Sequence, residues 1–220
     1  MSEVKSTERR TDPSISHIAV VGAGGIGSIF CSLLNKLISG GQVRVAPPEV
    51  AVFDFDTVSE SNLRHQDFGV NELHMPKPVI MGMRYGFAPI VRRFVAEDVK
   101  DYELIVVCAD NPGVRRVIYE GVDARNRAAT SGQFTGAFID LRSEGDVFAM
   151  FTHRLPLAQL MESLGKDSSS EVGVSCQIPD DRQSGIIQMG NFDVAVKGSQ
   201  LLLNMVRSQP YPHELIGTVL

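Results

Sequence analysis

The sequence predicts an α/β protein with a Rossmann-like, doubly wound and mostly parallel sheet that ends in an antiparallel C-terminal extension. Three patterns support this prediction: short apolar runs alternate with amphipathic segments, a glycine-rich turn follows the first run, and acidic residues follow later ones. Alternation of strands with helices is typical of this class. Because ligands bind at the carboxyl ends of its strands, we expect the glycines and acids to share one edge of the sheet.

The first two strands and the helix between them are expected in the N-terminal part. The apolar run at 17–21 is stopped by glycine and predicts a short buried strand. Apolar residues recur at steps of three and four positions over 26–38, which predicts a helix with one apolar face. Gly40-Gly41 ends this helix, a loop with two prolines follows at 42–49, and the run at 50–53 predicts the second strand.

Later segments complete the expected sheet. Further strands are predicted at 90–96 and at 104–108, and the second of these is a continuous apolar run typical of a parallel strand buried on both faces. The segments 134–141 and 146–151 predict an antiparallel strand pair. Apolar positions between about 186 and 207 predict a final helix.

Composition and charge exclude several classes of partner. The chain has 220 residues, of which 43% are hydrophobic and 21% charged, and this balance is that of a globular protein with a full core. A formal net charge of -5 predicts no nucleic-acid partner and no anionic membrane surface. The first residues contain no apolar signal segment, and no apolar run is long enough to cross a bilayer. We therefore expect a cytoplasmic protein.

A glycine-rich turn and an acidic residue provide the first indication of a ligand. Gly22-Ala23-Gly24-Gly25-Ile26-Gly27 stands between a predicted strand and a predicted helix, where backbone N–H groups and the helix dipole favour a phosphate. Asp54 follows the second strand and is placed to accept hydrogen bonds from ribose hydroxyls. These two signals predict a nucleotide, and most proteins with such a turn bind NAD or FAD.

A dense series of polar and charged residues, which begins at Asp54, narrows the class of nucleotide-binding protein that the sequence predicts. It consists of the run 54–66, then Pro76-Lys77, and then Ala109-Asp110-Asn111 with Arg115. The order of these residues, and nearly their spacing, resembles the motifs of the superfamily of ThiF, MoeB, HesA and the ubiquitin-activating enzymes. The resemblance extends over roughly residues 17 to 130. The C-terminal part, through the expected final helix, is similar to ThiF-family proteins of the bacterial PRTRC gene systems.

The resemblance implies an enzyme with ATP and Mg²⁺ as cofactors. It implies adenylation of the C-terminal carboxylate of a ubiquitin-like or sulfur-carrier protein, with release of pyrophosphate. The expected organisation is a flexible arm at 1–16 and one adenylation domain at 17–220, with a nucleotide-binding half at 17–130 and a partner-binding half at 131–220. Superfamily members usually pair through this domain, so a homodimer is expected, and a conjugating-enzyme-like protein is a further candidate partner.

The resemblance also assigns roles to individual residues. Lys77 is expected to neutralise the phosphates, and Asp110 to hold Mg²⁺ as a hard carboxylate ligand. The expected catalytic residues are Arg64, His65, Lys77, Asp110 and Cys176, and the expected cofactor-binding residues are Gly22, Gly24, Gly25, Gly27, Asp54, Asp56, Asn62, Gln66 and Asn111.

The position of the catalytic arginine departs from the family pattern. The family has Asn-Leu-x-Arg-Gln, whereas this chain has Asn62-Leu63-Arg64-His65-Gln66, so that His65 stands where arginine is expected. Three explanations are compatible with this order: a shift of the loop brings Arg64 to the phosphates, protonated His65 takes the role, or adenylation is weakened. Arg9 or Arg10, from the arm of a partner subunit, is a further candidate.

The cysteines allow one catalytic role and no structural one. Cys176 is the candidate nucleophile for a thioester, although an inert thiol is also compatible with its surroundings. The three cysteines are widely spaced, and the sequence has no Cys-x-x-Cys pair, so no disulfide framework or structural zinc is expected.

The acidic segment before Pro112 is compatible with two roles. Asp110 and Asn111 can form a helix N-cap there, and capping by Asn111 would leave Asp110 to face Mg²⁺. Two functions besides adenylation also remain compatible with the sequence. They are an NAD-dependent oxidoreductase, which the glycine turn and Asp54 permit, and a non-catalytic nucleotide-binding subunit, which the displaced arginine favours.

Overall fold

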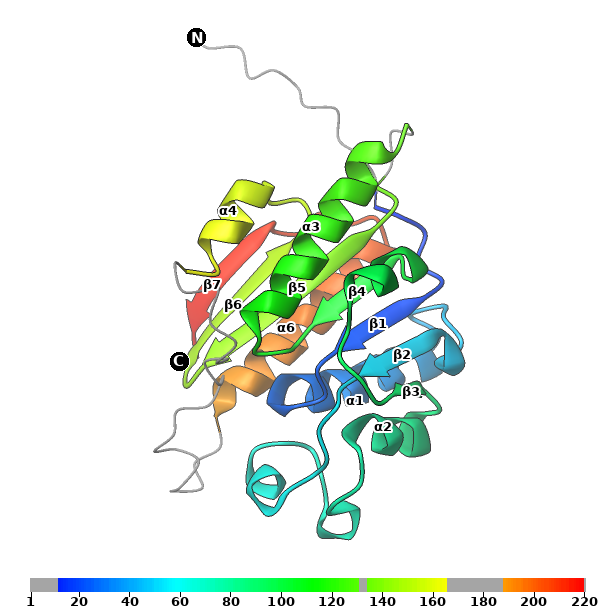
Figure 1. Ribbon diagram of the computed structural model, residues 1–220, viewed down its shortest axis with the longest axis vertical. Helices are drawn as coiled ribbons and strands as arrows, with labels where there is room; N and C mark the ends of the chain where they lie inside the picture. The colour runs from blue at the N-terminus through cyan, green and yellow to red at the C-terminus, as the bar shows by residue number, and fades with distance from the viewer. Residues whose placement is uncertain (1–11, 131–133, 166–187, 220) are drawn as a thin grey trace.

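The protein contains a single seven-stranded sheet with helices on both faces (Figure 1). The computed structural model describes residues 12–130, 134–165 and 188–219. The strand order is β3-β2-β1-β4-β5-β6-β7. This architecture confirms the predicted Rossmann-like α/β class, including its antiparallel extension.

The parallel part of the sheet positions the site. Strands β1 (Ile18–Val21), β2 (Val50–Phe53) and β4 (Leu104–Val107) are buried throughout, as their continuous apolar runs predict. β1 pairs in parallel with β2 on one side and with β4 on the other. The chain order reverses between β1 and β4, and this is the point at which open α/β sheets leave a crevice for ligands.

The antiparallel part follows β4. β5 (Ala137–Glu144) is parallel to β4, whereas β6 (Val147–Thr152) and β7 (Glu214–Thr218) continue the sheet in antiparallel pairings. The β5–β6 pair confirms the predicted hairpin. β7 was not predicted, because an edge strand that alternates between exposed and half-buried residues carries only a weak apolar signal.

Helices cover the sheet on both faces (Figure 1). α1 (Gly25–Ser39), α2 (Lys77–Tyr85) and α6 (Met189–Val206) pack in one apolar core, and α3 (Pro112–Ala128) and α4 (Leu157–Glu162) pack in the other. α1 and α6 match the expected helices. No helix in the described part of the chain is long and apolar enough to cross a membrane.

The third strand was predicted in the wrong place. It was expected at 90–96, but β3 spans Ala88–Ile90. Gly86 ends α2 in the left-handed conformation, with φ 75°, and the chain enters the strand two residues later. After Ile90 the chain leaves the sheet and turns toward the 3₁₀ helix η4 (Ala96–Asp101), where Arg92 binds Asp98.

A buried ionic cluster joins α3 to β5. Asp140 of β5 is fully buried and lies 3.0 Å from Arg115 Nε and 2.7 Å from Arg142 Nε. The Tyr119 hydroxyl also donates to this carboxylate. Burial alone would raise the pKa of Asp140, but the two guanidinium groups and the hydroxyl hold it below its usual value. The carboxylate is therefore ionised in the core and needs its partners.

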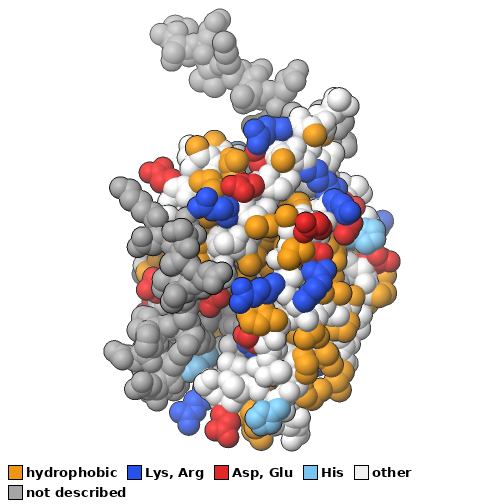
Figure 2. Space-filling model, viewed as in Figure 1, with side chains coloured by type: hydrophobic (Ala, Val, Ile, Leu, Met, Phe, Trp, Pro, Cys, Tyr) orange, Lys and Arg blue, Asp and Glu red, His pale blue; other side chains and the backbone are white. Residues whose placement is uncertain are grey.

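Charges on the surface are mixed. On the face drawn in Figure 2, Lys and Arg side chains are interspersed with Asp and Glu side chains. A mixed distribution does not produce the single-sign field that attracts nucleic acid. The described residues on the face that carries α3 and α4 therefore form no concentrated basic surface.

Candidate functional site

A pocket of about 470 Å³ opens at the carboxyl ends of β1, β2 and β4. Its walls come from the turns after these strands, from the start of α2 and from α6. Its size falls within the range of small-molecule sites. Ten residues expected to bind or act on a nucleotide line it: Gly22, Gly24, Gly25, Asp54, Asp56, Asn62, Gln66, Lys77, Asp110 and Asn111.

Two glycines of the turn are required by the backbone. Gly22 has φ +94°, and a Cβ on it would lie 2.8 Å from the Ala109 nitrogen. A Cβ on Gly27 would lie 1.9 Å from the Gly22 carbonyl oxygen. Gly27 does not line the pocket, so it supports the site by letting α1 approach the turn closely.

Gly24 has a different role. It is the N-cap residue of α1, and no side chain caps this helix. A Cβ on Gly24 would meet no atom nearer than the Gln66 amide nitrogen at 3.8 Å. The space beside Gly24 is thus open, and uncapped N–H groups and the helix dipole make it suitable for an anion.

Asp54 provides an acceptor beside this turn. Its Oδ2 accepts a hydrogen bond from the Ala23 nitrogen at 2.7 Å, and its Oδ1 accepts one from the Asp56 nitrogen at 2.8 Å. Burial raises the pKa of Asp54 above its usual value, although both backbone N–H groups and nearby Lys77 act in the opposite direction. The carboxylate is held rigidly where ribose hydroxyls are expected.

Lys77 is a buried cation in the pocket wall. It is the first residue of α2 and is only 4% exposed. Its Nζ lies 3.2 Å from Asp56 Oδ2, and the Asp56 side chain is 53% exposed. Since a buried lysine with one exposed partner retains unused donors, Lys77 is well placed to bind a further anion.

The 3₁₀ helix η2 (Glu60–Arg64) brings two amides to the pocket. Asn62 Oδ1 accepts a hydrogen bond from the Ser59 nitrogen at 3.0 Å, which leaves its NH₂ group as the ligand-facing donor. Gln66 Oε1 is buried and has no hydrogen-bond partner among the residues that the structure describes. A buried polar atom without a partner is costly, and a bound ligand would relieve that cost.

Asp110 and Asn111 divide two tasks between them. Asn111 caps α3, because its Oδ1 accepts hydrogen bonds from the nitrogens of Gly113 at 2.7 Å and Val114 at 3.3 Å. Asp110 is exposed to the pocket and forms no hydrogen bond or ion pair with another described residue.

The donor set around Asp110 fits Mg²⁺. The described residues contain no cluster of three or more His, Cys, Asp or Glu side chains that would enclose a metal ion. Mg²⁺ does not need such a cluster, since it commonly takes one or two carboxylates together with phosphate oxygens and water. A lone carboxylate beside the glycine-rich turn therefore suits this ion.

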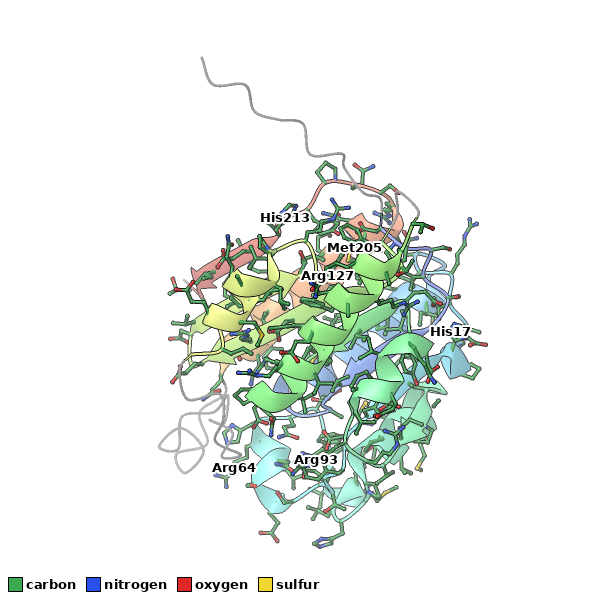
Figure 3. All side chains as sticks on the ribbon, turned by 45° about the horizontal axis from the view of Figure 1, so that its top comes forward. His17, Arg64, Arg93, Arg127, Met205 and His213 are labelled. Atoms are coloured by element: carbon green, nitrogen blue, oxygen red, sulfur yellow. The ribbon has the colours of Figure 1, made fainter. Side chains whose placement is uncertain are left out.

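Neither candidate for the catalytic arginine position lines the pocket. Arg64 is exposed at the end of η2, and Figure 3 shows it at the outer edge of the molecule. His65 is only 6% exposed, but it also lies outside the pocket lining. Cys176, Arg9 and Arg10 lie outside the described residues.

The pocket contains residues that the sequence analysis missed. Arg92 and Arg93 follow β3, and the Arg93 guanidinium lies over the Phe55 ring, 4.6 Å from its centroid. A correct placement of β3 would have put both arginines at the carboxyl edge. Asn191 reaches the pocket from α6, and no sequence motif pointed to it. The remaining unexpected lining residues include Phe53, Ser61, Phe94 and Val114.

The fold and the pocket define the class: a Rossmann-like α/β protein with a polar, glycine-lined pocket at its topological switch point. The chain belongs to the ThiF family, whose model matches residues 6–210. This match confirms the resemblance seen in the sequence. Comparison with the sequences of curated proteins gives no match.

Solved structures share the fold at low identity. E. coli MccB, solved with ATP, has a TM-score of 0.60 and 13% identity, and the match covers 93% of this chain and 60% of MccB. E. coli tRNA N6-threonylcarbamoyladenosine dehydratase, TcdA, in complex with AMP, has a TM-score of 0.59 and 15% identity, with 88% and 86% covered. PaaA has a TM-score of 0.58 and 14% identity, with 93% and 61% covered. The chain therefore spans about three fifths of MccB and PaaA.

Proposed function

We propose that this chain uses ATP to adenylate a carboxylate, and that the substrate is the C-terminal carboxylate of a ubiquitin-like or sulfur-carrier protein. The observation that carries the proposal is the meeting of an uncapped glycine turn, buried Lys77 and unpaired Asp110 in one pocket of the described chain. Membership of the ThiF family and the likeness to structures solved with ATP and AMP support it.

The chemistry needs positive charge where two anions meet. The substrate carboxylate attacks the α-phosphorus of ATP, an acyl adenylate forms, and pyrophosphate leaves. Lys77 would neutralise phosphate oxygens, the N–H groups at the start of α1 would bind them, and Asp54 would hold the ribose. Bound Mg²⁺ would neutralise phosphate charge beside Asp110.

The proposed class of substrate draws on the comparison with MccB. MccB has been solved with MccA, and this chain shares the fold of MccB. We propose a small protein substrate, a homodimeric enzyme and a cytoplasmic location, with a conjugating-enzyme-like protein as a further partner. A thioester on Cys176 belongs to the same proposal.

A non-catalytic nucleotide-binding subunit is the second candidate. The observation that favours it is the absence of both Arg64 and His65 from the pocket lining. Such a subunit would bind ATP at the same turn and would not form an adenylate. The two functions therefore differ in turnover and not in nucleotide affinity.

ATP–pyrophosphate exchange separates these functions. The assay uses the full chain with Mg²⁺ and candidate ubiquitin-like or sulfur-carrier proteins. We expect exchange that requires the partner and falls at least about 100-fold in Lys77→Ala and in Asp110→Ala, because each removes charge stabilisation in the transition state. Exposed Lys36 and Asp101 supply the matched controls Lys36→Ala and Asp101→Ala, which should retain activity.

Two outcomes would contradict the proposal. Tight ATP binding without exchange, for every partner tried, would favour the non-catalytic subunit. Preferential binding of NAD over ATP, measured by competition, would favour an oxidoreductase on the same fold.

A further inference from the structure

Two long helices begin at the same edge of the pocket. α1 begins at Gly25 and α6 begins at Met189, and they lie side by side behind the sheet with their first turns together (Figure 1). Neither helix has a side-chain cap at its N-terminus. The positive ends of both helix dipoles are therefore directed at one region, although helix ends alone do not identify a ligand.

Asn191, in the first turn of α6, provides the independent observation. It is only 2% exposed and lines the pocket. Its Oδ1 accepts a hydrogen bond from the hydroxyl of Ser143, which is itself buried on β5. This bond leaves the NH₂ group as the free end of the amide.

The NH₂ group lies beside the first residue of α1. A Cβ on Gly25 would be 2.7 Å from Asn191 Nδ2, so glycine at this position leaves room for the amide. Nδ2 donates no hydrogen bond to another described residue. Nδ2 itself keeps some accessible surface and can be reached from the pocket, and its location at two helix N-termini makes an anion the fitting acceptor.

We propose that Asn191 donates a hydrogen bond from Nδ2 to a phosphate oxygen of the bound nucleotide, and that Ser143 is the positioning residue that orients it. The proposal rests on the proposed ATP-dependent function and deepens it. It makes the phosphate site a joint product of the glycine turn and of α6, which begins near the C-terminal end of the chain. The N-terminal motif would then be an incomplete site without α6.

The chemistry of the position allows a ligand-binding role of Asn191 to be separated from a purely structural one. If Asn191 were only structural, it would need nothing beyond the hydrogen bond that its Oδ1 accepts from the Ser143 hydroxyl. An isosteric aspartate at position 191 would accept the same hydrogen bond. Aspartate is moreover favourable in the first turn of a helix, because its negative charge complements the dipole. Replacement of the donor by a carboxylate would therefore preserve folding and oppose a phosphate.

The test compares Asn191→Asp with Asn191→Ala, Ser143→Ala and the control Asn204→Ala. Asn204 lies near the other end of α6, where it bonds Gln200 and the Pro210 carbonyl. Affinities for ATP with Mg²⁺, AMP and adenosine are measured by calorimetry, and thermal unfolding is measured without ligand. We expect ATP affinity to fall about 10- to 100-fold in Asn191→Ala, since a hydrogen bond to a charged group is lost, and further in Asn191→Asp.

Adenosine and the remaining variants should behave differently. Adenosine affinity should change less than about twofold in every variant, because adenosine has no phosphate. Ser143→Ala should weaken ATP binding less than Asn191→Ala, and Asn204→Ala should not weaken it. Asn191→Asp should unfold nearer the wild-type temperature than Asn191→Ala, because it retains the hydrogen bond from Ser143 and carries a negative charge favourable in the first turn of α6.

The outcomes separate this inference from the proposed function. Wild-type ATP affinity in Asn191→Asp, or an equal loss for adenosine and ATP, would overturn the role of Asn191 and leave ATP-dependent adenylation standing. Failure of the wild-type chain to bind any adenine nucleotide would overturn the proposed function itself.

Discussion

At the scale of single residues, the glycine turn combines two different needs. Gly22 and Gly27 are glycines because the backbone leaves no space for a Cβ, while Gly24 borders open space at the start of α1. Glycine is therefore required for close packing at positions 22 and 27, whereas at position 24 it borders space that is open to a ligand. This difference can be measured.

We predict opposite effects for two alanine substitutions. Gly27→Ala should lower the free energy of unfolding by more than about 2 kcal/mol, because its Cβ would overlap the Gly22 carbonyl oxygen. Gly24→Ala should change stability by less than about 1 kcal/mol and should weaken ATP binding, because the methyl group would enter the space beside the turn. Urea unfolding and ATP titration check both. Equal stability losses in the two variants would contradict this division.

Lys77 and Asp110 show how burial differs between two charged groups that line the pocket. Lys77 is almost fully buried and has one anionic partner, whereas Asp110 is exposed and has none among the described residues. A buried cation is positioned before the ligand arrives, but an exposed carboxylate keeps the water that Mg²⁺ retains. Lys77 therefore suits a role as a fixed positive charge, and Asp110 suits a role as a ligand of an exchangeable Mg²⁺ ion.

At the scale of elements, the turn after β4 depends on the start of α3. Asn111 caps this helix and thereby sets the direction in which the preceding Asp110 enters the pocket. Pro112 at the first helical position favours the same boundary, since it needs no N–H partner there. The sequence alone allowed Asp110 or Asn111 to be the cap, and the hydrogen bonds assign it to Asn111.

We predict that Asn111→Ala lowers the free energy of unfolding by about 1 kcal/mol, the usual cost of a lost N-cap. For a chain of this length the melting temperature should fall by about 2–4 °C. Asn111→Asp should retain stability, because its carboxylate can accept the same backbone hydrogen bonds. Differential scanning calorimetry measures the change. A melting temperature unchanged in Asn111→Ala would show that the cap is not needed.

At the scale of the whole molecule, a buried ionic cluster ties the two parts of the sheet to α3. Asp140 lies on β5, which pairs with parallel β4 on one side and antiparallel β6 on the other. Arg115 comes from α3, and Arg142 comes from β5 itself. Loss of the carboxylate would leave two guanidinium groups without their counterion in or near the core.

We predict that Asp140→Asn destabilises the protein by about 3–5 kcal/mol at pH 7. The pKa of Asp140 in the folded state is below its usual value of 3.8, so its stabilising contribution is present above about pH 4 and is lost as pH falls further. The stability difference between wild type and Asp140→Asn should therefore shrink progressively as pH falls below about 4. Urea unfolding across this range measures it.

A milder change provides the control for this cluster. Tyr119→Phe removes one hydrogen-bond donor to Asp140 and leaves both ion pairs in place, so a loss of about 1–2 kcal/mol is expected. A pH-independent difference between wild type and Asp140→Asn would contradict the assigned ionised state.

Much of the fold was predictable because its signals are local. Continuous apolar runs identified β1, β2 and β4, and a three-to-four-residue period identified α1 and α6. The edge strands β3 and β7 were misplaced or missed, since half-exposed strands carry little apolar pattern. Ten of the expected site residues share one pocket, because parallel strands bring their carboxyl ends to one edge.

The sequence by itself determined the fold class, the glycine-rich turn and the family, because these depend on residues that are close in the chain. The tertiary structure alone decided that Arg64 and His65 lie outside the pocket lining and that Arg93 and Asn191 lie within it. The path of η2, the end of β3 and the packing of α6 on α1 settle these positions. Each of these positions depends on contacts between segments that are far apart in the sequence, and no local sequence pattern predicts such contacts.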